Sequence, residues 1–458
     1  MICTSDVPRW PIENRIPYFH EAGQDEQARL VFRNPFSAGW RKEVVSNPNG
    51  NVTPLKRQMV DGGNSPWTIA SGQARPVTWV LVDDRPGNST QSMGLIEALG
   101  WPYELKTLRF HTSCTSKNWY LPPMIHHVDQ EKSSLLCAPW PDLIITAGQR
   151  TAPVAKWIKR QHQGKTRIVQ LGRKGGLVMD ELDLVVTPRY CQLPPHPNRL
   201  VTTFSLNRIT TEKLEKAAGE GSPVMDVVKR PRLVCLIGGA TPRYQFDESV
   251  ARQMGADFVR MAKETGGELV VLTSRRTGQG VTNILESQLA GIGQVFSWNP
   301  QQALLPYVTA LALADVIVVT GESEAMLAEV AATDKVMVIY PLPRKSRTLL
   351  HVINPAGYIK SWLLRHSHLL DLDAGSSLSR GQVLQDICTW FFARGYCQPP
   401  RRLELLHQDL LALGIAQWFG EPLNAHGRKP FNETARVAAY IRALFGGLPQ
   451  EESKESDS

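Results

Sequence analysis

Short apolar runs alternate with amphipathic stretches through the middle of the chain, from residue 76 to about residue 346. The runs are rich in Val, Ile and Leu, and each ends in a turn that contains Gly, Asp, Ser or Thr. Runs of this kind predict buried strands, whereas the stretches between them have the spacing of helices. Strands that alternate with helices form parallel sheets covered by helices. The expected fold class is therefore α/β.

The alternation falls into two blocks, and we expect each block to form a Rossmann-like parallel-sheet domain. The first block starts with the apolar run 77–82 and the second with the run 232–237, and a connector that begins with the prolines at 194–197 and extends to about residue 230 lies between them. The predicted parts are a poorly ordered N-terminal extension (1–75), an N-terminal domain (76–225), a C-terminal domain (226–346), a helical segment (347–446) and an acidic tail (447–458).

The segment 316–340 carries the strongest local signal for a ligand site. A β-branched run ends in Thr320-Gly321, a helix of small residues follows, and a second apolar run is stopped by prolines. This order predicts backbone N–H groups at a helix N-terminus beyond the carboxyl end of a strand, which suits phosphate. An ordinary β-α-β unit, in which Glu322 only complements the helix dipole, has the same spacing. The candidate contacts are Thr320, Glu322, Ser323 and Glu329.

Four other loops follow predicted strands, at 83–88, 147–150, 238–243 and 274–277. Ligands of open α/β sheets bind beyond the carboxyl ends of the strands, so we expect these loops and the Thr320 turn to form one rim. The candidates on the first-domain loops are Asp83, Asp84, Arg85, Gly87, Asn88, Gln91 and Gln149. The candidates on the second-domain loops are Gly238, Gly239, Ser274, Arg275, Arg276 and Thr277.

The residue types suggest different roles for the two sets. Asp83 or Asp84 could act as a general base toward an acceptor hydroxyl, and Asn88 could hydrogen-bond a substrate in the same catalytic loop. Two arginines at the end of a strand are placed to neutralise a diphosphate, and a Gly-Gly pair lets a ligand approach the backbone. Plainer explanations remain open, because the aspartates also fit an Asx-type turn and the arginines a solvated basic loop.

Composition narrows the function classes. Lys and Arg (51) exceed Asp and Glu (43), giving a net charge of +8, but the charge is dispersed, so we expect anionic ligands rather than nucleic acid. The seven cysteines form no C-x-x-C pair, the histidines are scattered and no apolar run spans a bilayer. We therefore expect a cytoplasmic chain, with a peripheral position at the inner face of a membrane as an option, and no metal site.

The ordered blocks resemble the mitochondrial fission "elongated mitochondria" family of plants and its bacterial relatives. The segment from Trp79 to Gly100 resembles the opening block of that family. Further matching blocks follow in order at 183–188, 237–239, 273–277, 314–320 and 432–435, and the Leu-Pro-Pro at 193–195 is closer to the bacterial branch. The family is similar to two-domain glycosyltransferases of the GT-B type.

This resemblance implies a GT-B-like arrangement in which the second domain holds a nucleotide-sugar. Gly239 and the 274–275 loop would meet the diphosphate, Ser323 the phosphate or sugar, and Glu329 the ribose. The 84–88 loop would face an acceptor, and the final helix would return to the first domain. The nucleotide-sugar would be a donor substrate, and no permanently bound cofactor is expected.

The favoured hypothesis is a nucleotide-sugar-binding glycosyltransferase that acts on an envelope or lipid-linked acceptor at a membrane surface. Two alternatives stay open. One is a non-catalytic adaptor that recruits a partner to a membrane, as the plant members recruit a dynamin-related GTPase. The other is a sugar-nucleotide epimerase of similar two-domain shape. The sequence specifies neither the donor sugar, nor the acceptor, nor the oligomeric state.

Overall fold

The computed structural model describes residues 75–111, 123–173, 181–299, 306–345, 398–423 and 428–446, with a few isolated positions outside these ranges. Residues 1–64 form a unit of their own, of which only the antiparallel strands β1 (Leu30–Val31) and β2 (Glu43–Val44) are described. Most of the predicted N-terminal extension and the predicted acidic tail therefore lie outside the described residues.

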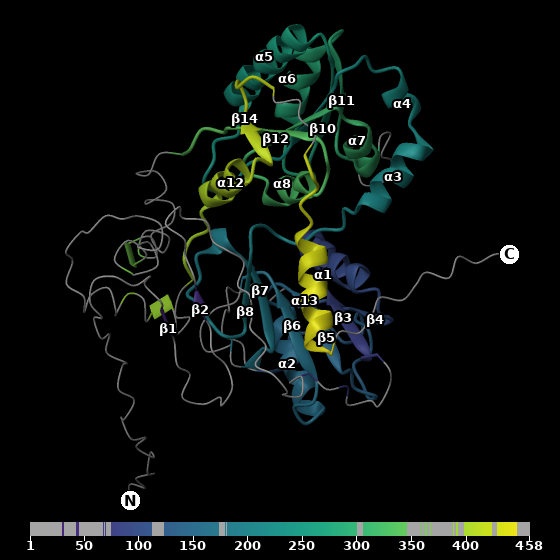
Figure 1. Cartoon of the computed structure of the whole chain (residues 1–458), viewed down its shortest axis with the longest axis vertical. Coiled ribbons are helices and arrows are strands. Elements are labelled where there is room, and N and C mark those ends of the chain that lie inside the picture. The colour runs from purple at the N-terminus through teal and green to yellow at the C-terminus, as the bar shows by residue number, and fades with distance from the viewer. Residues whose placement is uncertain are drawn as a thin grey trace, which may run out of the picture. The chain divides into compact units, whose positions relative to one another are not determined.

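The first sheet has six parallel strands in the order β4-β3-β5-β6-β7-β8 (Figure 1). Its strands are β3 (Thr78–Val82), β4 (Tyr103–Thr107), β5 (Leu143–Ala147), β6 (Arg167–Leu171), β7 (Leu184–Pro188) and β8 (Arg199–Thr202). Its helices are α1 (Pro86–Leu99) and α2 (Thr151–Gln161), and the 3-10 turn η3 (Arg189–Cys191) follows β7. Side chains that alternate along β3 divide between two clusters: Val80 packs with α1, and Leu81 packs with α2. Both faces of this sheet are therefore covered, as a parallel sheet requires.

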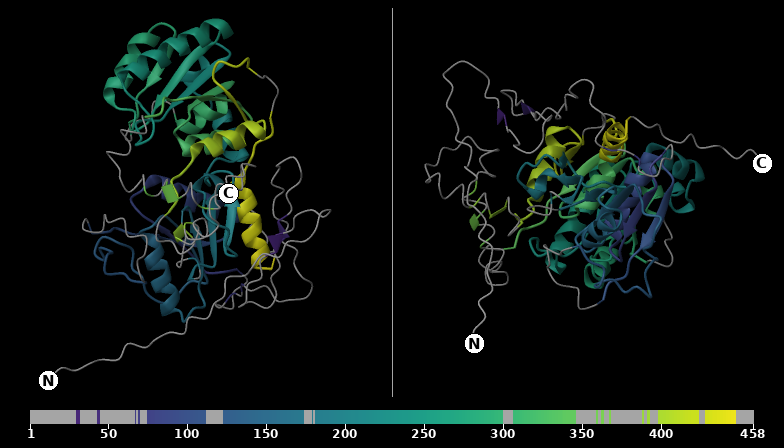
Figure 2. Two further views of the ribbon diagram at one scale, coloured as in Figure 1. Left: turned by 90° about the vertical axis from the view of Figure 1, so that its left-hand side faces the viewer. Right: turned by 90° about the horizontal axis from the view of Figure 1, so that it is seen from below.

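Helix α13 (Glu433–Leu444) is far from α1 in sequence and packs beside it (Figure 2). The side chain of Asn432 caps the helix by accepting a hydrogen bond from the backbone N–H of Ala435 at 3.0 Å. Ile441 is fully buried, and the ring of Phe445 contacts Trp67 and Trp101 edge-on. The last described helix thus completes the core of the first sheet.

The second sheet also has six parallel strands, in the order β11-β10-β9-β12-β13-β14. Its strands are β9 (Arg232–Ile237), β10 (Glu268–Thr273), β11 (Gly293–Phe296), β12 (Val316–Thr320), β13 (Val336–Tyr340) and β14 (Ala416–Trp418). Its helices are α5 (Glu248–Thr265), α6 (Gln279–Leu289), α7 (Tyr307–Leu313), α8 (Glu324–Ala331) and α12 (Leu403–Ala412), while α3 (Thr211–Glu220) and α4 (Pro223–Asp226) precede β9.

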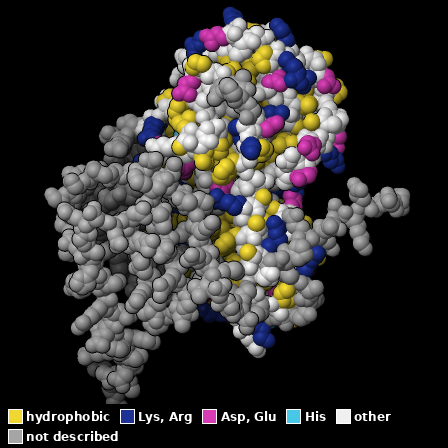
Figure 3. All heavy atoms as spheres, in the orientation of Figure 1, with side chains coloured by type: hydrophobic (Ala, Val, Ile, Leu, Met, Phe, Trp, Pro, Cys, Tyr) yellow, Lys and Arg dark blue, Asp and Glu magenta, His cyan; other side chains and the backbone are white. Residues whose placement is uncertain are grey.

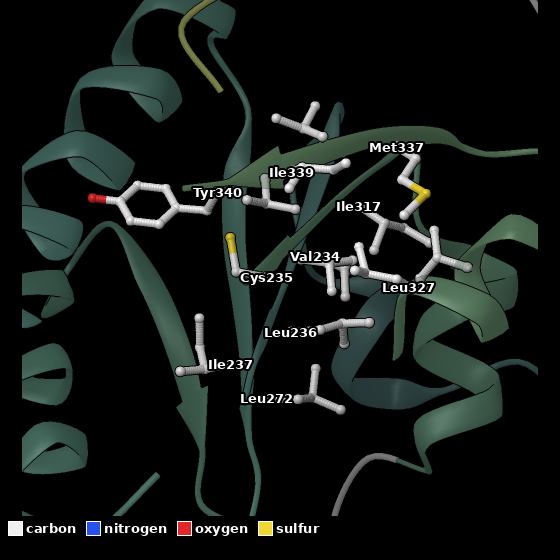
Figure 4. Packing of buried hydrophobic residues seen from close by; sticks show 14 of the residues in the cluster. Val234, Cys235, Leu236, Ile237, Leu272, Ile317, Leu327, Met337, Ile339 and Tyr340 are labelled. Atoms are coloured by element: carbon white, nitrogen blue, oxygen red, sulfur yellow. The ribbon is translucent and has the colours of Figure 1, made fainter. Parts of the chain in front are cut away.

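Strand β9 lies at the centre of the second core (Figure 4). Val234 of β9 pairs with Val270 of β10 on one side and with Ile317 of β12 on the other, and all three are fully buried. Figure 4 shows Val234 and Ile317 between helices on both sides of the sheet. The predicted α/β class with two Rossmann-like parallel sheets is confirmed.

Strand β14 departs from the sequence analysis, which expected the segment 347–446 to be helical. Ala416 pairs with Met337 and Trp418 with Ile339, so this three-residue strand extends the second sheet in parallel beyond β13. A strand this short has no alternating pattern to reveal it, and its identity comes from its partner β13.

Two further features are the distribution of charge on the surface and the character of the helices. Acidic and basic side chains are interspersed over the visible face of the molecule (Figure 3). Within the described ranges, no helix combines the length and the apolar character needed to cross a bilayer.

Replacement of Ile441 by Ala should destabilise the first-sheet domain, because the side chain fills the interface between α13 and that sheet. We expect a loss of roughly 2–4 kcal/mol in the free energy of unfolding. The matched control is Leu413→Ala, at a side chain that is 50% exposed, with an expected change of about 0.5 kcal/mol or less. Urea unfolding followed by tryptophan fluorescence measures both, and equal losses would contradict the packing of α13.

Candidate functional site

The strand order of the second sheet reverses between β9 and β12. The chain passes from β9 outward to β10 and β11, and then returns to β12 on the other side of β9. In an open α/β sheet, ligands bind at such a switch point, beyond the carboxyl ends of the two strands. The loops that follow β9 and β12 here are Gly238-Gly239 and the turn from Thr320 to Ser323.

Two hydrogen bonds join these loops across the switch point. The N–H of Gly238 donates to Oγ1 of Thr320 at 2.9 Å, and the N–H of Gly239 donates to Oε1 of Glu322 at 2.7 Å. A Cβ atom on Gly238 would lie 1.8 Å from Oε1 of Glu322, so this close approach requires glycine. The Gly238-Gly239 loop and the turn after β12, which the sequence analysis selected separately, are therefore directly hydrogen-bonded to one another.

The carboxylate of Glu322 occupies a position that an anionic ligand could fill. The residue is only 4% exposed, and its second oxygen, Oε2, is buried without a hydrogen-bond partner in the described part of the chain. Burial raises the pKa of Glu322, against the lowering effects of the Gly239 N–H and of the charge on Arg276. Glu322 is thus a buried acid whose charged form is destabilised by its surroundings.

The loop after β10 supports the Gly-Gly turn from the side. The hydroxyls of Ser274 and Thr277 donate to the carbonyl of Gly238 at 2.7 and 2.6 Å. The hydroxyls of these two predicted ligand contacts are therefore already hydrogen-bonded to a backbone carbonyl. Arg275 and Arg276 are both exposed to solvent, and the charge of Arg276 acts on Glu322.

Two residues outside the predicted set fix the β12 turn from behind. Nε2 of His407, on α12, donates to the carbonyl of Gly321 at 2.7 Å. Arg401 forms an ion pair with Glu324, which follows the buried N-cap residue Ser323 at the start of α8. Both partners are about 80 positions away in sequence, with separations of 86 and 77 residues, so local motifs could not reveal them.

Glu329 has a protein partner that the sequence analysis did not identify. The hydroxyl of Tyr307, on α7, donates to Oε2 of Glu329 at 2.8 Å. Burial raises the pKa of Glu329 to about 7, and the bond from Tyr307 only partly opposes this. A ribose contact by Glu329 stays a prediction, and a ribose hydroxyl would have to share or replace the Tyr307 bond.

The first sheet has its own switch point, between β3 and β5, and the predicted loops 83–88 and 147–150 lie on either side of it. Asp83 accepts hydrogen bonds from the side chain of Asn88 at 3.2 Å and from Nη2 of Arg150 at 3.0 Å. Arg150 also pairs with Asp84. The Asp83 side chain is 1% exposed and that of Asp84 is 54% exposed, so Asp84 is the more accessible candidate base.

Close packing links the two first-domain loops. Gly148 has φ 87°, and a Cβ atom there would lie 2.4 Å from Nδ2 of Asn88. Gln91 donates to the carbonyl of Gly87 at 3.1 Å within the first turn of α1. Arg85 and Gly87 are exposed, and Gln149 is half-buried. Asn88 and Asp83 thus hold the loop together, while the remaining candidates stay accessible.

The model of the family described as mitochondrial fission ELM1 matches residues 86–362, which is more than half of the chain. The chain belongs to the mitochondrial fission ELM1 family. This confirms the resemblance drawn from the sequence blocks.

Two relatives of this family member are 24% identical to it. The RP120 protein of Rickettsia prowazekii matches over 308 residues, which is 60% of this chain and 86% of the relative. The mitochondrial fission protein ELM1 of Arabidopsis thaliana matches over 217 residues, which is 43% of this chain. The match spans only 50% of that plant protein's length.

Solved structures similar to this family member include Acinetobacter baumannii MurG, at TM-score 0.35 and 14% identity, covering 80% of this chain and all of that one. The UDP-GlcNAc 2-epimerase of Methanocaldococcus jannaschii matches at TM-score 0.40 and 11% identity, over 80% of this chain and 99% of that one. At these values the likeness transfers neither an activity nor a residue role to this chain.

The Glu329→Gln variant should change how stability depends on pH. Because the folded-state pKa of Glu329 is raised to about 7, the folded protein retains a proton that the unfolded chain releases from about pH 4.3 upward. Wild-type stability should therefore fall, relative to the variant, as the pH rises from about 4.5 to about 7. Allowing for partial exposure, we expect a difference of roughly 2 kcal/mol.

Urea unfolding of both proteins at several pH values measures this difference. The amide of the variant can still accept the Tyr307 hydrogen bond, so the comparison isolates the titration. Parallel pH profiles for the two proteins would contradict the raised pKa.

Proposed function

We propose that the protein binds the diphosphate of a nucleotide-sugar at the switch point of the second sheet and transfers the sugar to an acceptor. The observation that carries this proposal is the Gly239 amide, which already holds an anionic oxygen at 2.7 Å. A backbone N–H that binds a carboxylate oxygen in this geometry is equally suited to a phosphate oxygen.

The chemistry of transfer fits the residues near that amide. When the bond between the sugar and the diphosphate breaks, negative charge develops on the leaving diphosphate. Fixed backbone N–H groups and a nearby guanidinium stabilise such charge without reorganising during the reaction. Gly239 supplies the amide, and Arg276, whose charge already acts on Glu322, supplies the cation.

The acceptor would lie at the first-sheet loop around Asp84. Its carboxylate is exposed enough to receive a proton from an acceptor hydroxyl, and its ion pair with Arg150 would orient it. Membership of a family named for mitochondrial fission and the net charge of +8 support work at an anionic membrane surface. We therefore propose an envelope or lipid-linked acceptor and a peripheral position at the inner face of a membrane.

Calorimetry with UDP and with a UDP-sugar tests the donor site. We expect heat that fits a dissociation constant of about 1 mM or tighter, since Glu322 competes for the Gly239 amide. No heat with any common nucleoside diphosphate at concentrations adequate for that constant would refute nucleotide binding. Incubation of a UDP-sugar without acceptor, followed by product analysis, separates transfer from epimerisation.

The Glu322→Gln variant should bind UDP about tenfold more tightly at neutral pH, because the change removes a buried negative charge beside the diphosphate. The control is Glu268→Gln. Glu268 starts β10 at the opposite, amino-terminal edge of the same sheet, and its carboxylate accepts from the N–H of Lys229 at 2.9 Å. Unchanged or weaker binding by Glu322→Gln, with the control at wild-type affinity, would show that Glu322 does not compete with the ligand.

A non-catalytic adaptor is the second candidate, favoured by the match to the Arabidopsis mitochondrial fission protein. The two candidates differ in what Arg276→Ala does. If the protein is a transferase, the Arg276→Ala variant should lose UDP binding and should no longer restore the phenotype of cells that lack the protein. As an adaptor, it should keep its phenotype, because Arg276 is then only an exposed side chain of a surface loop.

A further inference from the structure

Four arginines meet next to the β12 turn, and of these only Arg401, the partner of Glu324, has been described above. Arg173 follows β6, Arg243 lies in the loop after Gly239, Arg344 follows β13, and Arg401 precedes α12. We call these four residues the arginine cluster. Their proximity is visible in their pKa values, because the charges of Arg243 and Arg401 both act on Arg173.

Backbone hydrogen bonds hold the segments that carry the cluster. The N–H of Lys345 donates to the carbonyl of Arg243 at 2.9 Å, and the N–H of Arg402 donates to the carbonyl of Tyr190 at 2.9 Å. The guanidinium of Arg173 reaches the carbonyl of Pro399. The cluster therefore combines strand-end segments of both sheets with the chain that leads into α12.

Only part of this positive charge is neutralised. Arg401 pairs with Glu324, and Arg344 pairs with Glu404. Arg173 and Arg243 have no ion pair with a carboxylate among the described residues, and Nε of Arg173 is buried without a hydrogen-bond partner there. Four guanidinium groups thus face two carboxylates.

The environment makes this excess unfavourable without a ligand. The pKa of Arg173 is lowered to about 10, chiefly by burial and in part by the cations Arg401 and Arg243, against the raising effects of Cys191 and Glu324. Burial also lowers the pKa of Arg243. Glu404 and Tyr244 oppose this effect, and the charges of Arg401 and Arg344 add to it. Buried charges without partners are costly, so an anion that bridges these groups would be bound favourably.

We propose that the arginine cluster binds a phosphoryl group, with Arg173 and Arg243 as its principal contacts. A phosphoryl group has several oxygens that can accept bidentate bonds from guanidinium groups on different segments. The cluster is connected to the proposed donor site through Arg401, whose partner Glu324 is two residues from Glu322 in the sequence. The inference rests on the proposed function, and the phosphoryl group could come from the donor's diphosphate or from a phosphorylated, lipid-linked acceptor.

Calorimetry with inorganic pyrophosphate tests the cluster directly. Wild-type protein should bind it, and the double variant Arg173→Gln with Arg243→Gln should bind at least tenfold more weakly. The single variant Arg243→Gln should bind pyrophosphate at least threefold more weakly. It tests the cluster without the change at the more buried Arg173, which could cause misfolding. The control Arg252→Gln, at an exposed ion pair with Glu248 on α5, should stay at wild-type affinity. Thermal unfolding shows which variants are folded.

Two further ligands identify the source of the phosphoryl group. Geranyl diphosphate that binds to UDP-saturated protein with undiminished affinity would assign the cluster to an acceptor. Competition between geranyl diphosphate and UDP would assign it to the donor's diphosphate. Absence of pyrophosphate binding to wild type, or equal affinity in wild type and the folded variants, would overturn the inference.

The same measurements separate this inference from the proposed function. Arginine-dependent pyrophosphate binding without any UDP binding would retain the cluster and refute the nucleotide-sugar site. If the protein binds UDP but not pyrophosphate, and neither Arg173→Gln nor Arg243→Gln weakens UDP binding, the nucleotide-sugar site is retained and the arginine cluster is refuted.

Discussion

The hydrogen bond from the Gly239 N–H to Glu322 is the contact on which the second-sheet site depends. It joins the ends of β9 and β12 at the point where the strand order reverses, and it brings a carboxylate into the interior at 2.7 Å from a backbone donor. Gly238 must lack a side chain for this contact to form, and the hydroxyls of Ser274 and Thr277 hold the same turn from the other side. The position is therefore rigid before any ligand arrives, which is the condition for electrostatic stabilisation of a reacting group.

The first-sheet loop shows how similar residues take different roles. Asp83 and Asp84 are adjacent in sequence and share Arg150, but Asp83 is buried and accepts from Asn88 as well. The hydrogen bonds that Asp83 accepts from Asn88 and Arg150 stabilise the loop. The exposed neighbour Asp84 also pairs with Arg150 but stays open to solvent, so a shared turn supplies one structural and one accessible carboxylate.

The central strands of both sheets could be predicted from the sequence because they are buried on both faces and read as near-continuous apolar runs. β8 and β14 could not. β8 (Arg199–Thr202) pairs with β7 but lies in the segment that was expected to be a connector, and β14 has only three residues and takes its strand identity from β13. The loops of the site were also predictable, since each directly follows a strand. The sequence analysis did not select Arg150, His407 and Arg401. Their hydrogen-bond and ion-pair partners at the site lie 66 to 86 residues away in the sequence. The sequence analysis could place a glutamate at the helix start, but only the fold shows which group it contacts.

Complementing the helix dipole does not by itself explain the acids at the start of α8. An exposed carboxylate would interact with the dipole without losing its hydration. Glu322 is instead 4% exposed, has a raised pKa and leaves one oxygen without a hydrogen bond among the described residues. Its neighbour Glu324 forms an ion pair with Arg401, and Glu322 accepts the hydrogen bond of the Gly239 N–H. Under the proposed function, both acids hold groups that would otherwise bind phosphoryl oxygens, so a departing diphosphate would be replaced at once by internal carboxylates. Such replacement lowers ground-state affinity and favours product release, a step that limits turnover in many enzymes.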